Sequence, residues 1–139
     1  MRAIASLGGI GFLKPAPGTW GSLAVMPLAL LPPWVALLAA VIFTALGYWA
    51  LTRLPEATAD PGWVVVDEAA GQSLALAAAT GWLGVLLAFA LFRLFDITKP
   101  GPVGWADRRK GAFGVMADDV IAGAMAAAVL LLLALMGIR

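Results

Sequence analysis

The chain has 139 residues, the length of a single domain. Its 9 basic and 8 acidic residues leave a formal net charge of +1, and the only basic run is at residues 108–110, which argues against a nucleic-acid partner. Hydrophobic residues make up 63% of the sequence and charged residues 12%, whereas soluble domains have about 45–50% and about 25%, so lipid is the expected solvent for much of the surface. The sequence contains no cysteine and no histidine, which excludes disulfides, a Ser–His–Asp triad and zinc sites with thiolate or imidazole ligands.

The charged residues divide the chain into three long uncharged stretches, residues 15–52, 69–92 and 120–138. The last stretch has 19 residues and no proline, so as a helix it is long enough to cross a hydrocarbon layer of about 30 Å. The alternative is a buried helical core in a soluble protein. A domain of this size encloses too little volume for so many apolar side chains, which disfavours that alternative.

The first two stretches are each expected to form a helical hairpin. Pro32-Pro33 interrupts the first stretch, where proline breaks a helix, and Thr80-Gly81 lies at the centre of the second. The predicted helices cover residues 22–31, 34–52, 67–79 and 82–96. Together with the final run they predict an all-α, multi-pass membrane protein, a single domain over residues 1–139 with two helical hairpins and a C-terminal transmembrane helix.

Each predicted hairpin enters the membrane and returns, so the charged residues up to Asp119 are expected on one face and Arg139 on the other. The positive-inside rule, applied to Lys14, Arg53 and the basic run 108–110, makes the first face cytoplasmic. Helices of about 10 to 14 residues reach only about 15–21 Å, which is short of a full span. Polar ends that extend the helices and hairpins that enter the bilayer partway are both compatible with the sequence.

Acidic residues stand where three apolar segments reach this face: Asp67 and Glu68, Asp96, and Asp118 and Asp119. Five carboxylates gathered on one face would repel one another unless a cation lay among them. Oxygen ligands suit Mg²⁺ or Mn²⁺, so the sequence predicts that these five residues form a magnesium site. Helix capping is the alternative, because carboxylates in a first helical turn gain about 0.3–1 kcal/mol from the helix dipole.

A second group of charges follows the helical spacing i, i+3, i+6, which places Arg93, Asp96 and Lys99 on one side of a helix. In one interpretation Asp96 binds the metal while Arg93 and Lys99 hold a phosphate, the arginine by its planar fork and the lysine as a point charge. The alternative is an ion pair between Arg93 and Asp96, with Lys99 extended toward the lipid headgroups. Charges beside a membrane segment are costly and tend to be functional, which favours the first interpretation.

Two glycine-bearing segments adjoin the predicted helices. In the segment 15–22, Gly18, Thr19 and Ser22 are candidate ligands for an anion, because backbone N–H groups at a helix N-terminus attract negative charge. A plain turn capped by Ser22 explains the same residues. The segment 111–119 is expected to be a tight loop that brings its two terminal acids to the start of the last helix.

Four motifs carry a resemblance to a known family: PGTWGS at residues 17–22, VDEAAG at 66–71, FRLFDITKP at 92–100 and GVMADD at 114–119. In this order, over about residues 11 to 124, they resemble the phosphatidylglycerophosphatase A family. The resemblance implies an all-helical, Mg²⁺-dependent phosphatase that converts phosphatidylglycerophosphate to phosphatidylglycerol. It also implies phospholipid biosynthesis on the cytoplasmic side of the bacterial inner membrane.

The resemblance implies an active site formed by Asp67, Glu68, Asp96 and Asp119, with Arg93 and Lys99 as phosphate partners and the segment 17–22 lining the same site. Direct attack by water on phosphorus is preferred over attack by a carboxylate such as Asp67. The expected partners are the phospholipid substrate and the membrane, without nucleic acid, and no particular oligomeric state is predicted.

Three other functions are compatible with parts of this pattern: a small transport or assembly protein, a lipid phosphotransferase, and a phosphatase of a different phosphomonoester. Transport favours acids near the middle of apolar segments, whereas here they stand at the ends. The phosphotransferases carry an Asp-Gly followed by Ala-Arg, which Asp67-Glu68 does not provide. The sequence therefore favours the phosphatase.

Overall fold

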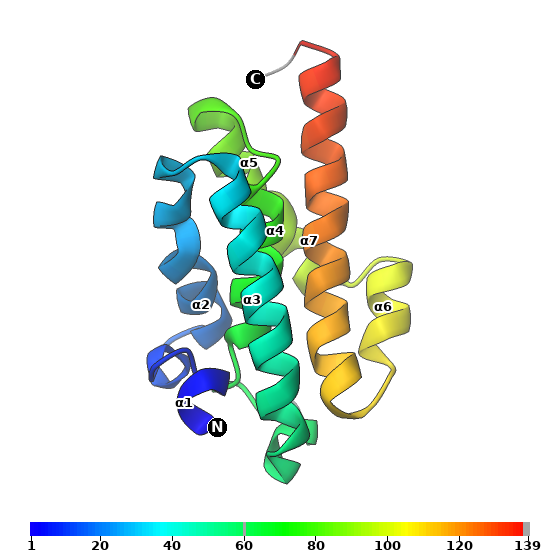
Figure 1. The fold of residues 1–139 in the computed structure, drawn as a ribbon. Coiled ribbons are helices and arrows are strands. Elements are labelled where there is room, and N and C mark those ends of the chain that lie inside the picture. The colour runs from blue at the N-terminus through cyan, green and yellow to red at the C-terminus, as the bar shows by residue number, and fades with distance from the viewer. Residues whose placement is uncertain (60, 138–139) are drawn as a thin grey trace.

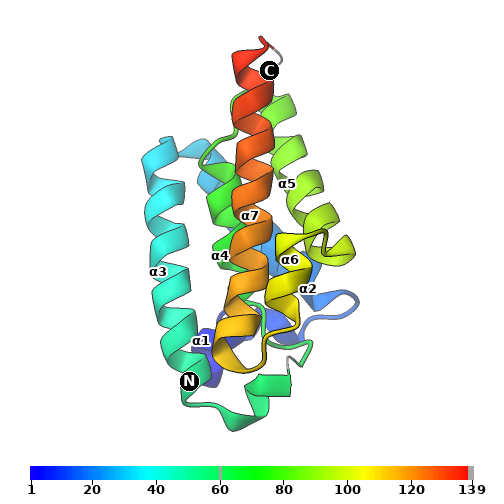
Figure 2. The same cartoon turned by 90° about the vertical axis from the view of Figure 1, so that its right-hand side faces the viewer.

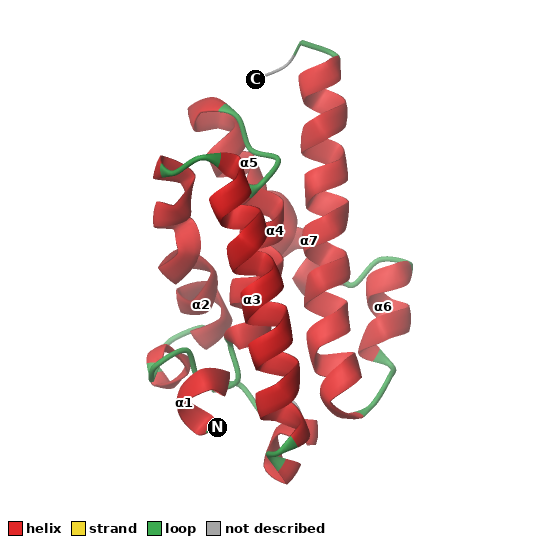
Figure 3. Cartoon of the chain, in the orientation of Figure 1, coloured by secondary structure: helices red, strands yellow, loops and turns green. Residues whose placement is uncertain are grey.

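The computed structural model describes residues 1–59 and 61–137, which form helices and connecting segments without a strand (Figure 3). The α-helices are α1 (Arg2–Ala5), α2 (Pro17–Val25), α3 (Pro33–Thr52), α4 (Val66–Leu76), α5 (Gly81–Thr98), α6 (Pro102–Asp107) and α7 (Gly111–Leu135). Short 3₁₀ helices cover Ile10–Phe12, Met26–Leu30 and Pro55–Ala59. The prediction of an all-α fold is confirmed.

Both predicted helix breaks lie where the sequence places them. Pro32 is extended, with φ −56° and ψ 149°, and Pro33 is the first residue of α3, a position that needs no backbone N–H donor. Thr80 is extended and Gly81 begins α5 with φ +68°, a left-handed conformation that glycine adopts without strain. The local chemistry of proline and glycine therefore sets both turns.

The predicted starting points of two helices, α2 and α7, are wrong, and both helices carry candidate site residues. Helix α2 begins at Pro17, so Ser22 lies inside a helix and does not cap it. Helix α7 begins at Gly111, so residues 111–119 are its first turns and not a loop. The glycines in that segment permit close packing. A Cβ added to Gly114 would lie 1.8 Å from the carbonyl oxygen of Arg109, and the short helix α6, which was not predicted, packs against this part of α7.

Helix α4 is the centre of the fold and packs against α2, α3, α5 and α7 (Figures 1 and 2). Its 11 residues are about 16 Å long, too short to cross a bilayer. Most of them are buried, including the polar side chains of Gln72 and Ser73. The short helix of the second hairpin is therefore enclosed by its neighbours.

Three helices of the described chain are long and apolar enough to cross a membrane: Pro33–Thr52, Gly81–Thr98 and Gly111–Leu135. Their outward faces carry large apolar side chains such as Trp34, Trp82 and Leu135, which are 65%, 82% and 85% exposed. A surface of this kind is stable against lipid and not against water. The chain is a small multi-pass helical membrane protein, as predicted.

The connections between the helices are divided between the two ends of the bundle. The turns near residues 31 and 80 and the C-terminal end of α7 lie at one end, and the N-terminus, the α3–α4 connection and the α6–α7 connection lie at the other (Figures 1 and 2). The predicted position of Arg139 opposite the other charges lies outside the described residues.

Helices α4 and α7 touch backbone to backbone at two glycines. A Cβ added to Gly123 would lie 2.2 Å from the carbonyl oxygen of Gly71, and one added to Gly71 would lie 2.3 Å from the carbonyl oxygen of Asp119. Small residues allow this approach between helices in a membrane. Residues one turn before each glycine are therefore brought close together: Asp67 and Glu68 on α4 and Asp119 on α7.

Candidate active site

The structure gathers the five predicted carboxylates from three helices into one cluster. They are Asp67 and Glu68 in the first turn of α4, Asp96 in the last turns of α5, and Asp118 and Asp119 within α7. Their ligand atoms form two groups, Asp67–Glu68–Asp119 and Asp96–Asp118–Asp119, and the atoms of each group lie within 4.8 Å of one another. Asp119 belongs to both groups, so the two groups share one carboxylate.

The cluster is buried and short of hydrogen-bond donors. Asp67, Asp118 and Asp119 are only 2–3% exposed, and neither Oε2 of Glu68 nor Oδ2 of Asp119 has a hydrogen-bond partner within the described chain. Burial raises the pKa of Glu68, although a side-chain hydrogen bond with Asp67 opposes the shift. Buried carboxylate oxygens without partners are unfavourable unless a cation binds them. An oxygen-only donor set of this kind fits Mg²⁺.

Helix capping explains only part of this arrangement. Asp67 and Glu68 lie in the first turn of α4, where the helix dipole favours them, and Oδ1 of Asp67 accepts a 3.0 Å hydrogen bond from the backbone N–H of Glu68. Asp96, however, lies near the C-terminal end of α5, where the dipole disfavours an acid. Asp119 lies well inside α7. The capping alternative therefore fails for two of the three helices.

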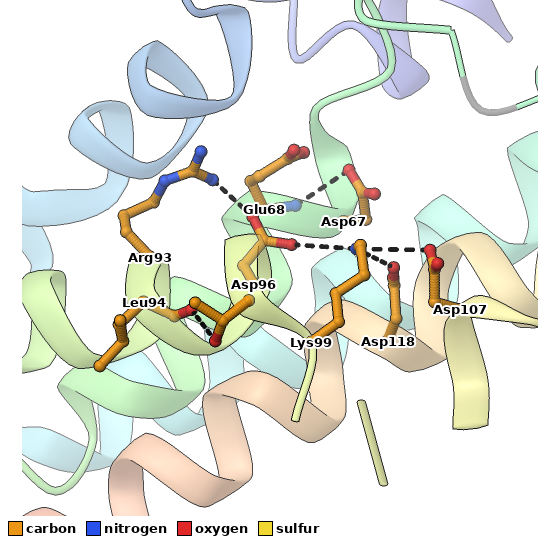
Figure 4. Close-up of polar contacts among 9 residues, drawn as sticks. Asp67, Glu68, Arg93, Leu94, Asp96, Lys99, Asp107 and Asp118 are labelled. Carbon is orange, nitrogen blue, oxygen red and sulfur yellow. Dashed lines mark hydrogen bonds and ion pairs between the residues drawn. The ribbon is translucent and has the colours of Figure 1, made fainter. Parts of the chain in front are cut away.

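Two cations contact the group formed by Asp96, Asp118 and Asp119, and Figure 4 shows both of them beside Asp96 and Asp118. Arg93 donates a hydrogen bond through Nη1 to Oδ2 of Asp96, the i, i+3 ion pair that the sequence offers as the alternative interpretation. Nζ of Lys99 lies 3.1 Å from Oδ2 of Asp118 and 4.0 Å from Oδ1 of Asp96. Lys99 therefore points into the cluster.

Lys99 also contacts an acid that the sequence analysis did not single out. Its Nζ lies 3.3 Å from Oδ1 of Asp107, at the end of α6. Burial lowers the pKa of Lys99, but the charge and hydrogen bond of Asp118, with the charges of Asp96 and Asp107, outweigh it and raise that pKa above its usual value. Lys99 is therefore a permanent cation at neutral pH. Asp107 was missed because α6 itself was not predicted.

The first turn of α2 borders the same cluster. A Cβ added to Gly18 would lie 2.8 Å from Oε1 of Glu68 and 3.2 Å from Nη1 of Arg93. Thr19 is half-buried beside it. One turn further, Ser22 is fully buried and its Oγ has no hydrogen-bond partner among the described residues. The structure thus brings Gly18 of the segment 17–22 to the site, in the first turn of α2.

Gly18→Ala is expected to lower activity without lowering stability. Alanine suits a helix better than glycine by about 0.5–1 kcal/mol, and the atoms that its Cβ meets are the mobile ends of Glu68 and Arg93. Displacing groups that orient a metal site typically costs about 10–100-fold. Specific activity and melting temperature measured on one preparation test this. Gly62→Ala, whose Cβ meets nothing within 4 Å, is the control, and wild-type activity in Gly18→Ala would contradict the assignment.

The fold and the site define a helical membrane protein with a buried carboxylate cluster between two basic side chains. The sequence profile of the family described as Phosphatidylglycerophosphatase A matches residues 3–134. This chain belongs to that family, as the four motifs predict. It is therefore an enzyme of the phosphatase class, a phosphoric monoester hydrolase.

Three curated relatives are similar to this chain over most of its length, and two of them carry the family's name. A Phosphatidylglycerophosphatase A of Haemophilus influenzae is 43% identical, over 82% of this chain and 76% of the relative. A Phosphatidylglycerophosphatase A of Escherichia coli strain K12 is 34% identical, over 88% of this chain and 76% of the relative. A protein of Bacteroides thetaiotaomicron, provisionally named a phosphatidylinositol-3-phosphatase, is 43% identical over 83% of this chain and 81% of the relative. No solved structure matches significantly.

Proposed function

We propose that this protein hydrolyses phosphatidylglycerophosphate to phosphatidylglycerol and phosphate, with Mg²⁺, as a step of phospholipid biosynthesis at the cytoplasmic face of the bacterial inner membrane. The observation that carries the proposal is the cluster of five carboxylates and two cations at one end of apolar helices. Two relatives are named for this substrate. A phosphate carried on a lipid headgroup would reach such a site without leaving the membrane surface.

In the proposed reaction the carboxylates bind the metal ion. Asp67, Glu68 and Asp119 would hold the ion, with Asp96 and Asp118 beside them. When bound, Mg²⁺ polarises a phosphoryl oxygen and lowers the pKa of a bound water. The attacking group is preferably water, with Asp67 as the alternative nucleophile.

Positive charge and backbone donors complete the proposed substrate site. The hydrogen bond to Asp96 uses one nitrogen of Arg93, so the rest of the guanidinium fork can donate to the phosphate. Lys99 adds a second positive charge that offsets the charge on the equatorial oxygens in the transition state. The N-terminus of α2, with Gly18, Thr19 and Ser22, would receive the same anion.

Phosphate release from purified protein in detergent micelles tests this function. With phosphatidylglycerophosphate as substrate, activity should require Mg²⁺ or Mn²⁺ and disappear with EDTA, because the ligand set contains only carboxylate oxygens. Recovery with Zn²⁺ alone would contradict the ligand argument. No phosphate release with any divalent ion would contradict the function.

A second candidate substrate is a 3-phosphorylated inositol lipid, favoured by the name of the Bacteroides thetaiotaomicron relative. The same assay with both lipids compares kcat/KM directly. We expect a preference for phosphatidylglycerophosphate, and a higher value with the inositol lipid would reassign the substrate while keeping the phosphatase chemistry.

The proposed orientation can be tested by cysteine labelling, because the chain has no native cysteine. Cysteines placed at Lys14, Glu56 and Lys110 should resist an impermeant thiol reagent in intact cells, since all three belong to the proposed cytoplasmic end. A cysteine at Thr80, the residue before α5, should react, because the turn before α5 lies at the opposite end of the bundle (Figure 1). Labelling at position 56 without labelling at 110 would contradict the shared face.

A further inference from the structure

The two carboxylate groups that meet at Asp119 differ in their contacts with cations. In the group Asp96–Asp118–Asp119, Nζ of Lys99 lies 3.1 Å from Asp118 and 4.0 Å from Asp96, and Arg93 bonds Asp96 as well. In the group Asp67–Glu68–Asp119, the buried Oε2 of Glu68 has no hydrogen-bond partner within the described chain, and neither has Oδ2 of Asp119, which both groups share. One group thus already contains a positive charge.

The ammonium of Lys99 lies among carboxylates in the way that a bound metal cation would. It has three N–H donors, and it lies within 4.0 Å of three carboxylates, those of Asp96, Asp107 and Asp118. A divalent ion placed among the same oxygens would lie within a few ångströms of this ammonium, and like charges at that range repel strongly in a buried site. A metal ion and the Lys99 ammonium are therefore competitors for this group.

The backbone at Lys99 supports a specific role for its side chain. Lys99 ends α5 in the left-handed region, with φ +51°, and its N–H bonds the carbonyl of Phe95. Glycine ordinarily occupies this position, because other residues are strained there by about 1–2 kcal/mol. From this position the Lys99 side chain extends toward Asp118 and Asp107 (Figure 4). A lysine here keeps a positive charge within the cluster in spite of the strain.

We propose that Lys99 takes the place of a second metal ion, so that the site binds one divalent cation per chain, at Asp67, Glu68 and Asp119. The ammonium holds Asp96 and Asp118 together and would add a second positive charge beside the bound phosphate. The inference rests on the proposed divalent-cation dependence and adds the number of ions and the residue that sets it.

Counting bound Mn²⁺ tests the inference without any measurement of turnover. Mn²⁺ prefers the same oxygen ligands as Mg²⁺, and equilibrium dialysis with electron paramagnetic resonance reports the number of ions per chain in detergent. The wild type should bind one ion. Lys99→Met, which keeps an unbranched apolar stem and removes the charge, should bind two, with the spectral broadening of a coupled pair.

Further variants separate this effect from misfolding. Lys99→Gly suits the left-handed backbone and should also bind two ions. Lys99→Arg keeps the charge and should bind one. Lys110→Ala, which removes an exposed lysine outside the cluster, is the matched control and should bind one.

The count of bound ions tests the role of Lys99, and the phosphate-release assay tests the proposed function. Two ions in the wild type, or one ion in both Lys99→Met and Lys99→Gly, would overturn the inference and leave the proposed phosphatase function in place. One ion in the wild type and two in the variants, without phosphate release from either lipid, would support the inference and contradict the proposed function.

Discussion

Asp119→Asn is expected to reduce kcat/KM by more than about 100-fold, because residues that merely support metal ligands already cost about 10–100-fold when replaced. Asp119 is the carboxylate common to both groups of the cluster. The amide keeps the shape of the side chain and removes one charge from each group, so both metal affinity and turnover should fall. Activity at saturating Mg²⁺, with Mn²⁺ binding on the same samples, measures the two effects separately.

The stability of Asp119→Asn should not fall with its activity and should instead stay the same or rise. Asp119 is buried and crowded by acids, and its Oδ2 has no hydrogen-bond partner among the described residues, so removing its charge relieves repulsion in the metal-free protein. The melting temperature of Asp119→Asn in EDTA should match or exceed that of the wild type. Glu56→Gln, an exposed acid paired with Arg2, is the control and should keep full activity. A less stable but fully active Asp119→Asn would assign this residue a structural role only.

Gly123→Ala is expected to destabilise the fold by about 1–3 kcal/mol, the usual cost of inserting a methyl group into a tightly packed interior. The added Cβ would lie 2.2 Å from the carbonyl oxygen of Gly71 and 2.9 Å from its Cα. These are backbone atoms of another helix, so relief requires α4 and α7 to separate. Separation also moves Glu68 away from Asp119, and metal affinity should fall with the melting temperature.

Gly84→Ala is the matched control for this substitution. Gly84 is also a glycine within a candidate spanning helix, but its added Cβ would meet its nearest neighbour at 3.4 Å, an ordinary contact. Alanine there should be neutral or slightly stabilising, because it lowers the entropy cost of the helix. Equal melting temperatures for Gly123→Ala and Gly84→Ala in detergent would show that the α4–α7 contact tolerates a side chain.

The sequence predicted the features that depend on local chemistry. Long apolar runs are stable only in lipid or in a buried core, and a Pro-Pro pair or a glycine with positive φ favours a break between two helices. The breaks at Pro32-Pro33 and Thr80-Gly81 and the all-α class therefore follow from the chain itself. The position of Arg93 and Asp96 on one side of α5 follows from helical periodicity, although their ion pair was the alternative interpretation and not the favoured one.

The sequence also identified which acids gather, although not how. Asp67, Asp96 and Asp119 are far apart in the chain, and their common feature is that each stands where an apolar run ends. In a membrane, hairpins that return to one face bring such ends together whatever the details of packing. This is why the cluster could be predicted without its geometry.

The geometry depends on contacts between residues distant in the sequence, which no local pattern encodes. The touching backbones at Gly71 and Gly123 set the distance from α4 to α7, and so make Asp119 common to both groups. The glycines in the segment 111–119 locally predict a loop. In the folded chain this segment is helical and belongs to α7, against which α6 packs. The position of Lys99 among Asp96, Asp107 and Asp118 likewise follows from the packing of α5, α6 and α7, because only a folded chain brings these side chains within reach of one ammonium.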